Sequence, residues 1–173
     1  MTTLLLASLL LFLFGFFNLF GIKTQLGTNM LVNFAIGLGL FFLVKKIGWK
    51  FFQSNTHFFY WVFIGVLVIT YVIGLEVKGS KRWIDLFFFR FQGSEFFKPF
   101  FILFFAQFFS QIQQRRNSLI SLISALFYFL IPTIIIFKQP DLGNAMVYVF
   151  IFLVMLFFSH ISKKNVLYLI GAG

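Results

Sequence analysis

The sequence has few charged residues. Asp, Glu, Lys and Arg make up only 10% of its 173 residues, whereas a soluble domain carries about 25%. Such a chain cannot cover a water-facing surface, which excludes a soluble globular protein. Apolar residues make up 61% of the chain and the mean hydropathy is +0.99, which excludes an intrinsically disordered chain. The composition therefore predicts an integral membrane protein.

Cysteine is absent from the sequence. This excludes disulfides, thiolate chemistry and any cysteine-based metal site. The two histidines, His57 and His160, lie far apart in the sequence and lack the spacing of metal ligands. We therefore predict no cofactor and no metal site built from Cys or His. The sequence does not exclude a divalent cation that is bound by other groups.

Acidic residues are the scarcer charge: 4 Asp and Glu stand against 14 Lys and Arg, which gives a net charge of +10. On a soluble chain this balance would indicate nucleic-acid binding. Here the basic residues lie between apolar runs, where lipid phosphates are the nearest anions. We therefore predict membrane lipids, and not nucleic acid, as partners.

Long apolar runs recur along the whole chain. Six stretches approach the ~17–25 residues that a helix needs to cross the hydrocarbon, at roughly 4–20, 28–44, 58–75, 96–110, 118–137 and 144–160. Membrane strands are excluded because open sheet edges cannot face lipid and because the alternation of a barrel is missing. Residues 166–173 resemble the first turns of a seventh span. The sequence predicts an all-α, polytopic transmembrane helix bundle that forms a single domain over residues 1–173, with its many Phe side chains facing lipid.

The basic residues between the spans bear on the orientation in the membrane. Connections after even-numbered spans and after odd-numbered spans hold seven Lys or Arg each. Five of the second set lie in one dense segment, residues 78–98, whose composition indicates a functional role. With that segment set aside the count is seven to two, and the positive-inside rule then places the N-terminus in the cytoplasm.

Charged residues gather in two segments on the other membrane side. In the first, Gly79-Ser80 predicts a turn, and Lys81-Arg82-Trp83 sets two cations beside an aromatic ring that favours the membrane interface. Cations in this arrangement suit an anionic lipid headgroup, since Arg binds phosphate with two N–H groups and Lys acts as a point charge.

Further along, Glu95 and Lys98 would share a helix face if a helix begins near Ser94. Pro99 either takes the first position of a helix that begins near Lys98 or kinks one that begins earlier. Asp141 follows a proline and predicts the N-cap of the sixth span. Each residue has a plain explanation as an anchor, an ion pair or a cap. Their convergence on one membrane face predicts a polar pocket.

Three blocks within these segments resemble a known family. They are Gly79-Ser-Lys-Arg-Trp-Ile84, Phe91-Gln-Gly-Ser-Glu95-x-x-Lys98 and Gln139-Pro-Asp-Leu-Gly143. Their order, their spacing and their position between spans are similar to those of the SEDS proteins (shape, elongation, division and sporulation), whose members include RodA and FtsW. The resemblance covers essentially the whole chain and the N-terminal part of the family's longer architecture.

The resemblance implies a peptidoglycan glycosyltransferase of the bacterial cytoplasmic membrane. Such a protein joins lipid II into glycan strands on the outer membrane face, for cell elongation or for division, together with a class B penicillin-binding protein. The family's N-terminus is cytoplasmic, in agreement with the corrected charge count. The residues implied in the substrate cavity are Lys81, Arg82, Trp83, Glu95, Lys98 and Asp141.

Two departures from the family pattern bear on activity. The family usually has Pro at the position of Gly93. The family's essential Asp follows span seven, beyond Gly173, so the sequence offers no catalytic residue, and we expect the 173 residues alone to be an inactive fragment of a larger SEDS bundle. Two other functions stay open: a flippase-like polyprenyl-lipid transporter and a non-catalytic membrane interaction module.

Overall fold

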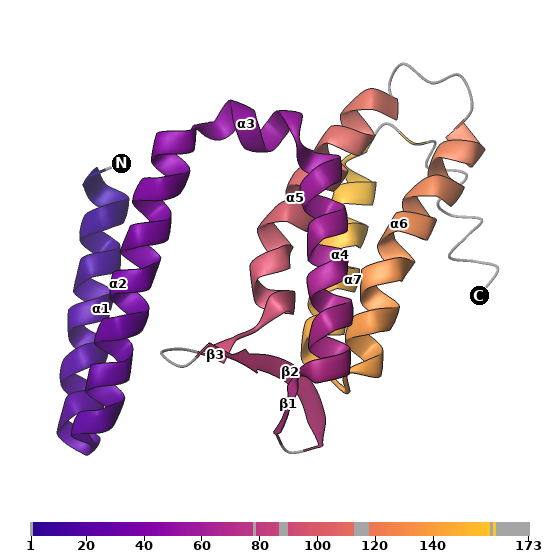
Figure 1. Cartoon of the computed structure of the whole chain (residues 1–173). Helices are drawn as coiled ribbons and strands as arrows, with labels where there is room; N and C mark the ends of the chain where they lie inside the picture. Colours follow the sequence, from indigo (N-terminus) through magenta and orange to yellow (C-terminus); the bar gives the residue numbers. More distant parts are fainter. Residues whose placement is uncertain (1, 78, 87–89, 113–117, 160, 162–173) are drawn as a thin grey trace. The chain divides into compact units, whose positions relative to one another are not determined.

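The computed structural model describes residues 2–77, 79–86, 90–112, 118–159 and 161 (Figure 1). Contacts divide the chain into two compact units, one of residues 1–49 with 86–89 and the other of residues 50–85 with 90–173. The first unit is a helical hairpin. The second holds an aromatic core and every residue of the predicted polar pocket.

Helices make up most of the described chain. They are α1 (Thr2–Ile22), α2 (Thr24–Ile47), α3 (Trp49–Ser54), α4 (Thr56–Ile73), α5 (Gly93–Ile112), α6 (Ser118–Lys138) and α7 (Leu142–Phe157). Each of the six long helices overlaps one of the six predicted stretches, which confirms the polytopic helical bundle. Four of them, α1, α2, α4 and α6, are long and apolar enough to cross a membrane, and α7 is apolar but shorter. The predicted start of a seventh span lies outside the described residues.

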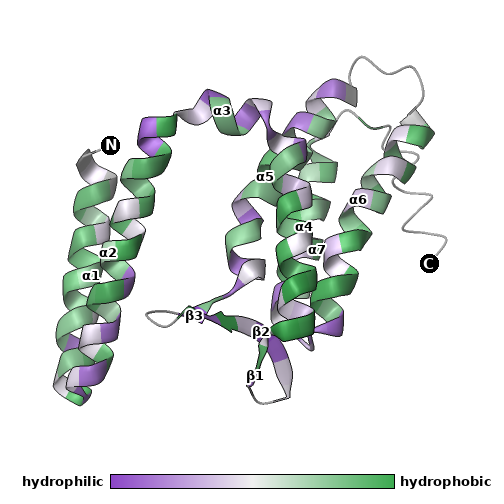
Figure 2. Cartoon of the chain, viewed as in Figure 1, coloured by the Kyte–Doolittle hydropathy of each residue, from purple (hydrophilic) through white to green (hydrophobic). Residues whose placement is uncertain are grey.

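Helices α1 and α2 pack side by side over their length. The rings of Phe12 and Phe34 stack with their centroids 3.8 Å apart. Gly27 permits the close approach, because a Cβ at this position would lie 3.0 Å from Cβ and 3.2 Å from the backbone Cα of Phe20. The outer faces of both helices are apolar and exposed (Figure 2). Such faces are stable in lipid, where no polar cover is needed.

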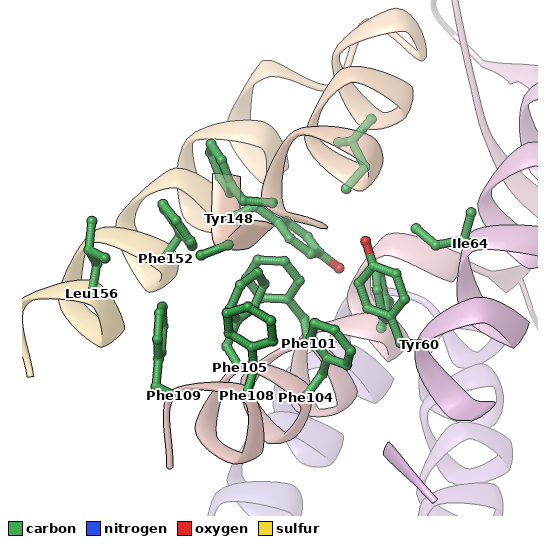
Figure 3. Close-up of a cluster of buried hydrophobic side chains, with 14 of the residues drawn as sticks. Tyr60, Ile64, Phe101, Phe104, Phe105, Phe108, Phe109, Tyr148, Phe152 and Leu156 are labelled. Atoms are coloured by element: carbon green, nitrogen blue, oxygen red, sulfur yellow. The ribbon is translucent and has the colours of Figure 1, made fainter. Parts of the chain in front are cut away.

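The second unit has a core of aromatic side chains between α4, α5, α6 and α7 (Figure 3). Helix α5 supplies Phe97, Phe101, Phe104 and Phe105, each at most 1% exposed. These positions recur at three- and four-residue intervals and so share one helix face. The prediction that the Phe residues mainly face lipid is therefore wrong for α5. Aromatic rings fill the space between helices, where offset and edge-to-face pairs are favourable.

A hydrogen bond between α4 and α6 compensates for a proline. Pro132 lies inside α6 and has no N–H to offer the carbonyl of Tyr128, four residues earlier. The Tyr60 hydroxyl of α4 donates to that carbonyl at 2.6 Å. In a membrane interior a carbonyl without a partner is costly, and this bond removes that cost.

A small antiparallel sheet connects α4 to α5. Its strands are β1 (Leu75–Val77), β2 (Ser80–Asp85) and β3 (Arg90–Phe91), in the order β1-β2-β3. The predicted turn at Gly79-Ser80 is confirmed: Gly79 has φ 76°, a left-handed conformation that glycine adopts without strain. The all-α prediction holds for the spans and misses these short strands.

Helix α5 begins at Gly93. The alternative in which the helix begins near Lys98 is therefore wrong, and Pro99 lies inside the helix. A side chain at Gly93 would be tight, because a Cβ there would lie 3.0 Å from Cγ1 of Val66 on α4. Glycine thus lets the start of α5 lie close against α4.

Candidate functional site

Asp141 forms the N-cap of α7, as the sequence predicts. Its Oδ1 accepts a bond from the backbone N–H of Asn144 at 3.4 Å, and its Oδ2 accepts one from the Asn144 side-chain amide at 2.8 Å. The residue is only 3% exposed. A carboxylate at a helix N-terminus is stabilised by the helix dipole as well as by these bonds.

Two residues from outside α7 complete the surroundings of this carboxylate. Arg82 of β2 donates from Nη1 to Oδ1 of Asp141 at 3.2 Å, and Gln92, just before α5, donates from Nε2 to Oδ2 at 3.1 Å. The acid is therefore paired with a cation and bonded on both oxygens. This is the condition under which a buried charge is tolerated.

Asn144 links the cluster to α5. Its side-chain amide also lies 3.4 Å from the hydroxyl of Ser94, which accepts the bond. The Ser94 carbonyl in turn accepts a bond from the Tyr148 hydroxyl at 2.8 Å. Because α5 begins at Gly93, Ser94 is a residue of the first turn of this helix. We call Arg82, Gln92, Ser94, Asp141 and Asn144 the Asp141 cluster.

Arg82 is the member of this cluster that reaches outward. Its side chain is 33% exposed, against 4% for that of Asp141. Within the described part of the chain, its Nε is buried and has no hydrogen-bond partner. A guanidinium carries five N–H donors in a fixed fork. The buried Nε is out of reach of an outside ligand, so an anionic group that approaches from the exposed side would meet the outer part of the guanidinium.

Glu95 and Lys98 form a second, separate ion pair. Lys98 Nζ lies 2.8 Å from Glu95 Oε2, three residues apart on α5, as predicted. Glu95 is 49% exposed on its side chain and Lys98 22%. The pair is therefore more open to its surroundings than Asp141 and lies within the first two turns of α5.

The remaining two predicted residues, Lys81 and Trp83, lie on β2 on either side of Arg82. Trp83 is half-buried and stands opposite Leu75 in the sheet. Lys81 is exposed and stands opposite Glu76. It lines a hollow of about 370 Å³ together with Lys138. The structure thus places five of the six predicted residues in the Asp141 cluster, the Glu95–Lys98 pair or the Lys81 hollow, and Trp83 lies on β2 outside these three groups.

Two amides of the Asp141 cluster, Gln92 and Asn144, were not predicted as site residues. Both lie in or beside the blocks that carry the family resemblance, and a polar amide next to an apolar run is the signal that could have identified them. Among the residues that the structure describes, no three His, Asp or Glu side chains lie close enough to hold a metal ion.

The sequence matches a family model along almost its full length. Residues 3–173 match the family described as cell cycle protein, which covers FtsW, RodA and SpoVE. The chain belongs to this family. It is a SEDS protein, and its apolar helices and its relatives make it a multi-pass protein of the inner membrane.

Curated relatives of this SEDS chain are named as peptidoglycan glycosyltransferases. It is 31% identical over 170 residues to a probable peptidoglycan glycosyltransferase FtsW of Methylococcus capsulatus, covering 90% of this chain and 43% of that relative. It is 35% identical over 127 residues to the peptidoglycan glycosyltransferase RodA of Treponema pallidum, covering 71% and 28%. The chain therefore spans less than half of the length of these relatives.

Solved structures share the SEDS fold. The rod shape determining protein RodA of Thermus thermophilus matches with a TM-score of 0.79 and 22% identity, over 98% of this chain and 57% of that one. A peptidoglycan synthase complex, described as coordinating polymerization and crosslinking, matches with a TM-score of 0.78 and 23% identity, over 99% and 51%. At this level of identity the matches establish the fold.

Proposed function

We propose that this SEDS chain acts in peptidoglycan synthesis as part of a glycosyltransferase that joins lipid II into glycan strands, with a class B penicillin-binding protein as partner. The observation that carries the proposal is the family match over residues 3–173, together with relatives named as peptidoglycan glycosyltransferases. In this proposal the N-terminus is cytoplasmic and the Asp141 cluster faces the outer side, where lipid II is used.

The reaction sets the demands on the site. The sugar 4-hydroxyl of one lipid II attacks the anomeric carbon of the growing chain, the new glycosidic bond forms, and the bond to the lipid pyrophosphate breaks. A base takes the hydroxyl proton, and cations offset the charge that develops on the pyrophosphate. We assign to these 173 residues the second task, and no catalytic residue.

Arg82 is the best placed residue for that task. It is partly exposed, and its guanidinium suits the oxygens of a pyrophosphate. Asp141 is buried and its oxygens are already bonded, so its role is to position Arg82 and not to contact the sugar. Lys98 and Glu95 are exposed enough to meet the polar head of the same substrate.

A binding assay tests the proposal. The full chain in detergent would be titrated with fluorescent lipid II, for the natural sequence, Arg82→Gln, Arg82→Lys and, as a matched loss of one cation elsewhere, Lys46→Gln. We expect Arg82→Gln to weaken binding about tenfold, since a hydrogen bond to a charged group is worth about 1.5–3 kcal/mol. Arg82→Lys should lose less, and Lys46→Gln should stay within about twofold.

Three outcomes separate the proposal from its rivals. Competition by undecaprenyl phosphate as strong as by lipid II would indicate carrier-lipid transport, and facilitated lipid movement across vesicles without a glycan product would support it. Equal binding by all variants would indicate an interaction module. Both results would overturn the proposal. A glycan ladder from the chain alone would exclude both rivals but would contradict the assignment of no catalytic residue to these 173 residues.

A further inference from the structure

The two neighbouring cations of β2 serve different places. Successive side chains of a strand point to opposite faces, and Arg82 is bonded to Asp141. Lys81 instead lines the hollow of about 370 Å³ on the other face of the strand. The hollow is thus separate from the Asp141 cluster.

Four segments of the second unit line this hollow, which is open to the outside. These segments are the end of α4, the β1–β2 hairpin, the end of α6 and the turn before α7. The lining residues are Tyr71 from α4, Glu76, Gly79 and Lys81 from the hairpin, Lys138 from α6, and Gln139 and Pro140 from the turn. Lys81 and Lys138 come from distant parts of the sequence to the same space. Among the described residues, no carboxylate lies within ion-pair distance of either ammonium group. Both positive charges are therefore available to a ligand.

The base of the hollow is rigid. Gln139 is 1% exposed, and its side-chain amide donates to the carbonyl of Leu67 on α4 at 2.9 Å. Its own backbone carbonyl accepts a bond from the Ser80 hydroxyl at 2.7 Å, which fixes the hairpin to the end of α6. These bonds hold the strand that carries Lys81 against the helix end that carries Lys138.

The hollow lies where two candidate spans end. These spans are Thr56–Ile73 and Leu119–Lys138, so Tyr71 is in the last turn of the first and Lys138 is the last residue of the second. Tyr71 is exposed, and Tyr and Lys at the ends of spans are residues that meet lipid headgroups at the membrane interface. A ligand of this hollow would therefore be reached from the headgroup layer.

We propose that this hollow binds the phosphate of an anionic phospholipid. Lys81 and Lys138 supply the two positive charges, and the Tyr71 hydroxyl supplies a donor at the rim. Glu76, opposite Lys81 in the sheet, repels the phosphate and so keeps the affinity moderate. The site uses none of the Asp141 cluster, so the proposal does not depend on lipid II.

Native mass spectrometry of the full chain tests this proposal. The protein in detergent is titrated with phosphatidylglycerol, and with phosphatidylcholine as the lipid without net charge. We expect one phosphatidylglycerol to bind in preference to phosphatidylcholine. The double variant Lys81→Ala with Lys138→Ala should weaken phosphatidylglycerol binding by about fivefold for each lysine, because a basic residue near an anionic lipid is worth about 1 kcal/mol. The matched control, Lys45→Ala with Lys46→Ala, removes the same charge elsewhere and should leave this binding within about twofold.

A second variant moves the affinity in the opposite direction. Glu76→Gln removes the repulsion and should tighten phosphatidylglycerol binding, a gain that misfolding cannot produce. Equal losses in the two double variants would show attraction by net charge alone and would overturn the site. So would a weakening by Glu76→Gln, because the Glu76 carboxylate would then support binding of the headgroup instead of repelling its phosphate. Displacement of the lipid by inorganic phosphate at equal concentration would overturn the assignment to a lipid.

Discussion

At the residue scale, two acids with similar partners differ in burial. Asp141 is 3% exposed and bonded to Arg82, Gln92 and Asn144, whereas Glu95 is about half exposed and bonded to Lys98. Asp141→Asn removes the charge that Arg82 faces and should lower the free energy of unfolding by about 2 kcal/mol. Glu95→Gln should lower it by less than about 0.5 kcal/mol, because exposed pairs contribute little.

Reversible unfolding of both variants in mixed micelles, followed by circular dichroism, measures these two losses. Equal losses would show that burial does not govern the Asp141 cluster. A larger loss for Glu95→Gln would contradict the description of its ion pair as exposed.

The same residues show how far sequence reasoning reaches. Charge scarcity identified Arg82 and Asp141, since a charged residue beside an apolar run is costly without a purpose. Their pairing across 59 positions follows from tertiary structure and has no local signal. The amides Gln92 and Asn144 carry no charge and are therefore weaker signals, although they complete the same carboxylate. Only the strand geometry showed that Lys81 lines a hollow separate from the site of its neighbour Arg82.

At the element scale, the bond from Tyr60 to the Tyr128 carbonyl exists because Pro132 interrupts α6. Tyr60→Phe should therefore lower the free energy of unfolding by about 1 kcal/mol. In a Pro132→Ala background, position 132 regains an N–H for this carbonyl, so the same change should lower it by less than half as much. A double-mutant cycle in mixed micelles measures this coupling.

Tyr148→Phe is the matched control for that cycle. Its hydroxyl also donates to a helix carbonyl, that of Ser94, but the residue four positions further on is Lys98, which has an N–H. The effect of Tyr148→Phe should be the same with Pro132 or Ala at position 132. A Tyr60→Phe effect that is equally insensitive to Pro132→Ala would show that the bond does not compensate for the proline.

Helices and strands differed in how well the sequence predicted them. The six long helices were predicted because each requires a long apolar run, a signal that hydropathy gives directly. The strands β1, β2 and β3 were missed because none exceeds six residues and their pairing depends on the hairpin lying against the end of α6. The position of Pro99 stayed open for a similar reason, since packing of Gly93 against Val66 favours an early start of α5.

At the scale of the whole molecule, the orientation in the membrane is still a prediction. The two membrane sides have equal numbers of Lys and Arg until residues 78–98 are set aside. Setting them aside is justified if these residues have a functional role. Hairpin residues that serve a substrate or a lipid would explain why so many cations lie on the outer side. The proposed sites and the cytoplasmic N-terminus therefore depend on the same premise.

The absence of cysteine makes this premise directly measurable. In the predicted topology, Lys50 in α3 and Lys138 at the end of α6 lie on opposite sides of the membrane. The 173 residues contain no cysteine, so a maleimide would label only a cysteine that is introduced by Lys50→Cys or Lys138→Cys. In intact spheroplasts a membrane-impermeant maleimide should label Lys138→Cys and leave Lys50→Cys unlabelled until the membrane is opened. The reverse pattern would place the Asp141 cluster in the cytoplasm, where an outer-face polymerase could not use it.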